Sequence, residues 1–191
     1  MKTVVLLSGG IDSLTLAEHE WRAGRLVGTV FVGLGQPAET EEYISAKWFS
    51  AKTQVPHKIC DIKGLDLGDM ENLKGASVVP SRNLILLSIA SNLAVSLGGE
   101  QLLIGANSND QRDYVDCRES ALVAASKAFV EMGGLPISAP FANVEKSQIV
   151  QLARQYGLEK DNAWSCYRSG TKPCGFCASC KEAELAWSAG K

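Results

Sequence analysis

The stretch Thr3-Val-Val-Leu-Leu7, followed by Ser8-Gly-Gly-Ile-Asp-Ser13, decides the fold. The five β-prone apolar residues predict a strand that is buried on both faces. The two glycines allow a tight turn, and a helix that begins there would bring several free N–H groups to one point. Such a turn suits a pyrophosphate group, with the hydroxyls of Ser8 and Ser13 as further donors. Asp12 is suited to hold Mg²⁺ against the phosphates.

Beyond this turn, apolar strand-like segments alternate with helix-like segments. Strands are predicted at residues 26–32, 58–62 and 101–105, and helices at 39–55, 83–97 and 120–132 and around 149–153. Because the 83–97 helix is apolar nearly all round, we expect it to be buried. The alternation predicts an α/β fold, a Rossmann-like parallel sheet with helices on both faces. We expect residues 1–160 to form this domain and 161–191 a metal-binding segment packed on it.

Composition narrows the classes of function. The 191 residues carry 19 basic and 21 acidic side chains, so the net charge is −2 and direct nucleic-acid binding is not expected. The apolar runs are too short for a membrane helix, and we expect a cytoplasmic protein without membrane contact.

The cysteines also carry a pattern. The motif Cys166-x7-Cys174-x2-Cys177-x2-Cys180 offers four thiolate ligands near the C-terminus. The expected metal ion is Zn²⁺, bound tetrahedrally in a structural role. An iron–sulfur cluster and a redox cysteine pair are the alternatives. Cys60 is predicted to lie in the core and Cys117 to pack beneath a polar loop.

The motifs carry a resemblance. Ser8-Gly-Gly-Ile-Asp-Ser13 looks like the SGGxDS signature of the N-type (PP-loop) ATP pyrophosphatases, which cleave ATP to AMP and pyrophosphate. With the four cysteines, the chain resembles the 7-cyano-7-deazaguanine synthases of queuosine-precursor biosynthesis. Four more segments match that family in order: 79–83 (V-P-x-R-N), 105–118 (G-x-N…D…Y-P-D-C-R), 146–149 (K-x-E-I) and 164–167 (W-S-C-Y).

The resemblance implies a set of site residues. Those expected at ATP are Ser8, Gly9, Gly10, Ile11, Asp12, Ser13, Arg82, Asn83, Gly105 and Lys146. Asp12, Lys146 and Arg82 are expected to be catalytic, since the two cations can neutralise phosphates. The alternative interpretation is that Arg82 and Lys146 are ordinary surface charges and that Asn83 is a helix cap. The base is expected at Asn107, Asp110, Tyr114, Asp116 and Arg118, where Asp110 or Asp116 could accept hydrogen bonds from a deazapurine.

The implied reaction joins ATP, 7-carboxy-7-deazaguanine and ammonia in a homodimeric ligase, with Mg²⁺ on the ATP. Adenylation, amidation and loss of water through a second adenylate give the nitrile. Departures from the family pattern, such as Val115 before Asp116 and Glu145 in place of a Ser or Thr cap, leave room for a divergent member. Such an enzyme would stop at the amide or use another amine, even one on a protein. A tRNA sulfur transferase and a non-catalytic zinc-bound interaction module are further alternatives, and Asn143 could cap the helix in place of Glu145.

Overall fold

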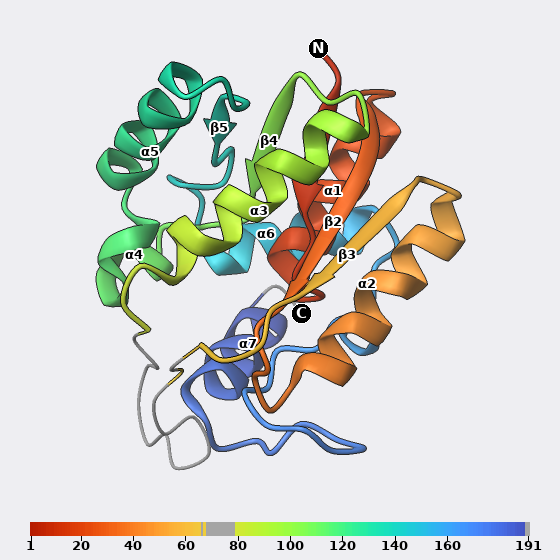
Figure 1. Ribbon diagram of the computed structural model, residues 1–191. Helices are drawn as coiled ribbons and strands as arrows, with labels where there is room; N and C mark the ends of the chain where they lie inside the picture. The colour runs from red at the N-terminus through yellow and green to blue at the C-terminus, as the bar shows by residue number, and fades with distance from the viewer. Residues whose placement is uncertain (66, 68–78, 190–191) are drawn as a thin grey trace.

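The chain folds around a parallel sheet with the strand order β3-β2-β1-β4-β5 (Figure 1). The computed structural model describes residues 1–65, 67 and 79–189. The strands are β1 (Thr3–Leu6), β2 (Leu26–Gly33), β3 (His57–Asp61), β4 (Gln101–Ile104) and β5 (Ile137–Ser138). Every neighbouring pair runs parallel. The predicted α/β fold is therefore confirmed.

The helices follow the predicted order. They are α1 (Ile11–Arg22), α2 (Glu39–Thr53), α3 (Arg82–Ser96), α4 (Asp110–Asp113), α5 (Glu119–Glu131), α6 (Lys146–Gln155) and α7 (Ala178–Ser188), with short 3₁₀ turns η1 (Val115–Cys117) and η2 (Lys160–Asn162). The sequence of residues 61–76, which is interrupted by glycines, predicts a loop, and most of this stretch lies outside the described residues. Among the described residues, no helix is long and apolar enough to cross a membrane.

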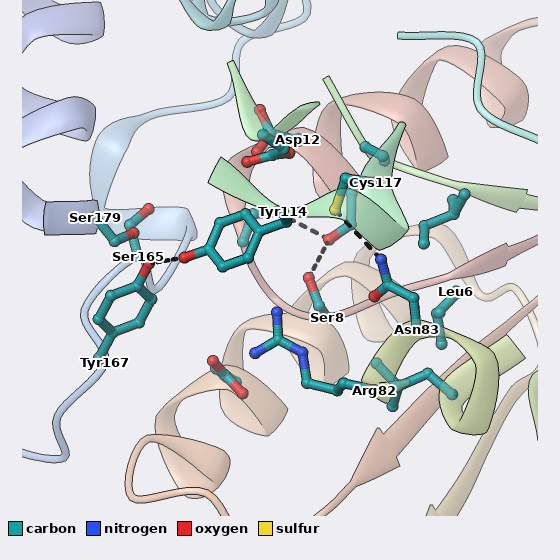
Figure 2. A pocket seen from close by; sticks show the side chains of 18 of the residues that line it. Leu6, Ser8, Asp12, Arg82, Asn83, Tyr114, Cys117, Ser165, Tyr167 and Ser179 are labelled. Carbon is teal, nitrogen blue, oxygen red and sulfur yellow. Dashed lines mark hydrogen bonds between the residues drawn. The ribbon is translucent and has the colours of Figure 1, made fainter. Parts of the chain in front are cut away.

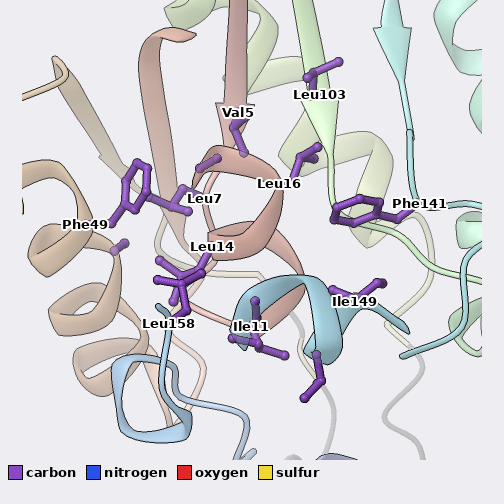
Figure 3. Close-up of a cluster of buried hydrophobic side chains, with 14 of the residues drawn as sticks. Val5, Leu7, Ile11, Leu14, Leu16, Phe49, Leu103, Phe141, Ile149 and Leu158 are labelled. Carbon is purple, nitrogen blue, oxygen red and sulfur yellow. The ribbon is translucent and has the colours of Figure 1, made fainter. Parts of the chain in front are cut away.

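Successive residues of β1 point into two separate cores. Val5 and Leu7 pack with α1, α2 and α6 on one face of the sheet (Figure 3). Val4 and Leu6 pack with α3 and α5 on the other face. Because side chains alternate along a strand, a strand covered on both faces must be apolar at every position. That requirement explains the unbroken apolar run at the start of the sequence.

Helix α3 is less buried than we expected. Leu87, Ala90 and Ala94 pack on the sheet, but Leu84 and Val95 are 50% and 52% exposed. An all-round apolar helix does not reveal which face meets the sheet, so the expectation of full burial was wrong. Cys60, expected in the core, is only half-buried because β3 is an edge strand.

Helix α6 is capped by Glu145 and not by Asn143. The Glu145 carboxylate accepts from the backbone of the first turn, and the Glu145 N–H donates to Gln148 Oε1 at 3.1 Å. This reciprocal arrangement is a capping box with a carboxylate at its first position. Asn143 instead donates its side-chain N–H to Glu119 at 3.4 Å. The departure at Glu145 therefore leaves the start of α6 well formed.

Truncating a buried leucine should destabilise the fold much more than truncating an exposed one. Leu16 of α1 is fully buried, whereas Leu185 of α7 is 71% exposed. We expect Leu16→Ala to lower the free energy of unfolding by about 2–5 kcal/mol, because it removes buried apolar area and leaves a cavity. The matched Leu185→Ala should cost less than about 0.5 kcal/mol. Urea denaturation of both variants checks this, and equal losses would contradict the assignment of the core.

Candidate active site

A cavity of about 430 Å³ opens at the carboxyl ends of β1 and β4 (Figure 2). The strand order reverses between these two strands, because β1 connects to β2 on one side and β4 continues to β5 on the other. In open parallel sheets, ligands bind at this point of reversal. The volume is in the range of small-molecule sites. Figure 1 shows α7, in blue, beyond the same ends of the strands.

The loop between β1 and α1 forms the floor of the cavity. Gly9 has a φ of +79°, and a Cβ placed there would lie 2.1 Å from the backbone oxygen of Glu42. Only glycine fits this position. Ser13 Oγ donates to the Gly10 carbonyl at 2.9 Å and lies 3.1 Å from Ser8 Oγ. The loop thus presents the first N–H groups of α1 at the cavity, which is an arrangement suited to phosphate.

A second glycine brings β4 against this loop. A Cβ on Gly105 would lie 2.9 Å from the backbone nitrogen of Ser13. The end of β4 therefore reaches the start of α1 without a side chain between them. This close approach is what joins the phosphate loop to the polar loop at 107–118 in one cavity.

Asp12 and Lys146 form an ion pair inside the cavity. Lys146 Nζ donates to Asp12 Oδ2, and Lys146 is 9% exposed. Burial by itself would lower the pKa of Lys146, but the Asp12 charge and hydrogen bond outweigh it, so the pKa is raised and the ammonium group stays charged. Asp12 Oδ1 is buried and accepts no hydrogen bond from the described residues. This free carboxylate oxygen fits a hard cation such as Mg²⁺.

Arg82 and Asn83 enter the site from the start of α3. The Arg82 guanidinium lies 5.9 Å from the centre of the Tyr114 ring. Asn83 is not the cap of α3, because Ser81 precedes the helix and Asn83 is buried inside its first turn. Its side-chain N–H donates to Cys117 Sγ at 3.2 Å. Burial raises the pKa of Cys117 to about 12, so this thiol stays protonated, and it packs beneath the loop as predicted.

Asp110 is the most perturbed acid of the polar loop. Burial, with the nearby charge of Asp12, raises its pKa to about 6. Its Oδ2 accepts from the backbone N–H of Asn107 at 3.1 Å. Asn107 in turn is fully buried and accepts from Asn109 and Asp110 through its side-chain oxygen. Asn107 therefore shapes the turn that holds Asp110 at the cavity.

The structure brings most of the predicted residues to the cavity wall. Of the predicted ATP and base residues, those that line it are Ser8, Gly10, Ile11, Asp12, Ser13, Arg82, Asn83, Gly105, Asp110, Tyr114 and Lys146. Four of the predicted residues do not line the cavity: Gly9, Asn107, Asp116 and Arg118. Asp116 accepts from the Asn83 N–H at 3.2 Å at the start of α3, and Arg118 is exposed before α5.

Sequence reasoning missed two groups of lining residues. On α2 and the loop before it, Gln36 Nε2 donates to Glu42 Oε2 at 2.6 Å. Burial raises the pKa of Glu42 to about 7. The acidic first turn of α2 was visible in the sequence, but it reads equally well as a response to the helix dipole.

The second missed group comes from the C-terminal segment. Its lining residues are Trp164, Ser165, Tyr167, Ala178, Ser179 and Glu182. The backbone N–H of Trp164 donates to the Gly9 carbonyl at 3.0 Å, and the backbone N–H of Gly170 donates to Glu41 Oε1 at 2.8 Å. The segment is thus a wall of the cavity, which the chain order alone does not reveal.

The four predicted ligand cysteines converge. The Sγ atoms of Cys166, Cys174, Cys177 and Cys180 all lie within 4.8 Å of one another. Backbone N–H groups donate to three of these sulfurs at 3.4 Å. Thiolates that are close together and supported in this way fit a metal ion or cluster with four sulfur ligands. The cluster could therefore hold a metal.

Comparisons with known proteins place the chain in a family. The model of the family described as "Queuosine biosynthesis protein QueC" matches residues 2–190. The 7-cyano-7-deazaguanine synthase of Caldicellulosiruptor bescii is 34% identical, over 95% of this chain and 90% of that protein. The 7-cyano-7-deazaguanine synthase of Thermoplasma acidophilum is 32% identical, over 94% of this chain and 84% of that protein.

Solved structures with low sequence identity share the fold. The U34-tRNA thiolase NcsA of Methanococcus maripaludis, solved with its [4Fe-4S] cluster, has a TM-score of 0.58 at 17% identity, covering 97% of this chain and 65% of that one. The NMN synthetase of Francisella tularensis has a TM-score of 0.58 at 13% identity, covering 98% and 77%. Since the family match spans nearly the whole chain, this protein belongs to the QueC family of queuosine biosynthesis proteins, as its motifs predicted.

Proposed function

We propose that this protein is an ATP-dependent ligase that converts 7-carboxy-7-deazaguanine and ammonia into 7-cyano-7-deazaguanine, with release of AMP and pyrophosphate. The observation that carries the proposal is the shared cavity. One phosphate-binding loop, two cations and one polar loop meet there at the reversal of strand order. The names of the curated relatives support the same product.

The site fits the charge changes of adenylation. The substrate carboxylate attacks the α-phosphorus of ATP, and the bond to the bridging oxygen of pyrophosphate breaks. Lys146 and Arg82 are placed to offset the negative charge that builds up on the phosphates. Mg²⁺, when bound at Asp12, would supply further neutralisation of the triphosphate. The N–H groups at the start of α1 would hold the phosphates in line.

The later steps need no nucleophile from the protein. Ammonia attacks the adenylated carbonyl carbon, AMP leaves, and the nitrogen loses one proton to solvent, which gives the amide. A second ATP adenylates the amide oxygen with release of pyrophosphate and one nitrogen proton, and loss of AMP with the last nitrogen proton forms the nitrile. The raised pKa of Cys117 agrees with this route, because a protonated thiol is a weak nucleophile. The carboxylate of Asp110 is suited to accept hydrogen bonds from the N1–H and amino group of the base.

The proposal assigns Zn²⁺ to the four cysteines, because a closed set of four thiolates is typical of structural zinc. It treats residues 161–191 as a metal-binding segment on a domain formed by 1–160. The homodimer that the resemblance implies and the expected cytoplasmic location belong to the same proposal.

The proposed reaction can be tested in one assay. Purified protein is mixed with Mg-ATP, 7-carboxy-7-deazaguanine and ammonium, and the products are identified by mass spectrometry. We expect nitrile and AMP in a 1:2 ratio. Asp12→Asn should lower kcat by about a hundredfold or more, because the uncharged amide neither pairs with Lys146 nor holds Mg²⁺. Leu185→Ala, a change on the exposed face of α7, is the control.

The outcomes separate the hypotheses. AMP with only the amide would show that the activation step is right and the endpoint is wrong. AMP with a conjugate to an added amine or protein would favour a divergent ligase. Absence of AMP in the wild-type reaction would overturn the proposal and return the other ATP pyrophosphatases to consideration.

Binding of the deazaguanine should depend on pH through Asp110. The pKa of Asp110 is raised to about 6, so its acceptor form is lost as the pH falls below that value. We expect the Kd of 7-carboxy-7-deazaguanine to rise by up to about tenfold per pH unit below pH 6. Titration calorimetry between pH 5 and pH 8 measures this. In Asp110→Asn the transition near pH 6 should vanish, and a transition that persists there would contradict the assignment.

Metal binding should depend on the clustered cysteines alone. Cys177→Ser is expected to reduce bound zinc from about one ion per chain to near zero and to lower the Tm, because one of four ligands is removed. Cys60→Ser, outside the cluster, is the matched control and should keep its metal. Elemental analysis of protein purified without air also distinguishes zinc from iron, and iron with inorganic sulfide would overturn the zinc assignment.

A further inference from the structure

Two tyrosines meet across the cavity. The hydroxyl oxygens of Tyr114 and Tyr167 lie 3.0 Å apart, although the residues are 53 positions apart in the chain. Both side chains line the cavity. Figure 2 shows the two rings approaching from opposite sides and joined through their hydroxyl groups. The pair therefore connects the polar loop after β4 with the C-terminal segment.

Tyr167 sits on the firmly held side of this pair. It directly follows Cys166, which is 1% exposed and accepts backbone hydrogen bonds from Arg168 and Cys174. Three residues earlier, Trp164 is hydrogen-bonded to the phosphate loop through the Gly9 carbonyl. The position of the Tyr167 ring is thus set by the cysteine cluster on one side and the phosphate loop on the other.

Tyr114 sits on the side of the pair that belongs to the polar loop, and its ring packs against one of the two cores. It follows α4, a single turn of four residues in which Asp110 and Gln111 are half-buried and Arg112 and Asp113 are exposed. Its N–H donates to the Asp110 carbonyl at 2.9 Å, and the Arg82 guanidinium lies over its ring. Short exposed helices are marginal in water, so the loop depends on contacts with other segments. The hydroxyl pair is such a contact, and it reaches the tip of the Tyr114 side chain.

The pair also leaves a donor for a ligand. A tyrosine hydroxyl carries one hydrogen that it can donate, and its oxygen can accept. One hydroxyl donates to the other, which then has its own hydrogen free. Among the described residues, neither hydroxyl has a second hydrogen-bond partner. The free O–H can therefore donate to an acceptor atom of a ligand in the cavity.

We infer that Tyr167 is a positioning residue of the deazaguanine site, which holds Tyr114 and the polar loop against the substrate through the hydroxyl pair. This inference rests on the proposed function. The C-terminal segment that contains the four cysteines would then contribute to substrate binding, in addition to any contribution to stability. It also predicts that the loss of either hydroxyl weakens binding of the deazaguanine, because each removal breaks the same bond, with the larger effect at the hydroxyl that also donates to the ligand.

The test compares variants that lose only an oxygen atom. They are Tyr167→Phe, Tyr114→Phe, the double variant, and Tyr156→Phe as control. The Tyr156 hydroxyl is bonded to His19 Nδ1 at 2.7 Å and lies outside the cavity wall, so the control makes the same chemical change elsewhere. For each protein, KM is measured for 7-carboxy-7-deazaguanine and for ATP, together with kcat, Tm and bound metal.

We expect Tyr167→Phe to raise the KM for the deazaguanine by about three- to tenfold, the range of one hydrogen bond, with the KM for ATP, the metal content and the Tm matching Tyr156→Phe. The double variant should have a KM for the deazaguanine no higher than that of the more strongly affected single variant, since the hydroxyl pair is already broken there. Additive losses, equal shifts of both KM values, or no difference from Tyr156→Phe would overturn the inference. Absence of AMP in the wild-type reaction would instead overturn the proposed function, and the inference with it.

Discussion

The close contact between the phosphate loop and its neighbours is the constraint on which the site depends. Gly9 lies against the backbone of Glu42 on one side, and its carbonyl accepts from Trp164 on the other. Gly105 brings the end of β4 against Ser13. The approaches to Glu42 and to Ser13 are too close for a side chain, and with the hydrogen bond from Trp164 they let α2, β4 and the C-terminal segment meet around one loop. The cavity exists because these three segments are held there.

The charges inside this cavity are unequal. Its acidic lining residues are Asp12, Glu42, Asp110, Asp113 and Glu182, and its cationic lining residues are Arg82 and Lys146. Burial is the main cause of the raised pKa values of Glu42 and Asp110, and neighbouring carboxylates add to it. Mg²⁺ and protons are the positive charges that could balance such a site when ATP binds. The acid excess therefore fits a nucleotide that arrives with its metal.

The local structures that follow from short-range rules were predicted correctly from the sequence. The apolar run of β1, the glycine loop and the cysteine spacing each predicted the right local structure, because each rests on a short-range rule. The buried face of helix α3 was harder to predict, because apolar residues on every side do not reveal which face meets the sheet. For Asn83, a helix cap was the alternative to a place in the ATP site, because asparagine favours caps. In the fold it faces Cys117, a contact between residues far apart in the chain.

By itself, the sequence determined the parallel α/β fold, the glycine turn between β1 and α1, the four-cysteine cluster and the family, since all of these follow from contiguous motifs or fixed spacings. Only the tertiary structure decided which polar residues share the cavity. In the fold, Asp116 and Asn107 make hydrogen bonds that support the site and do not line the cavity. Glu42, Tyr167 and Glu182 line the cavity instead. The physical reason is that these positions depend on how α2, the polar loop and the C-terminal segment pack around one another. No local pattern encodes the distance between segments that meet only after folding.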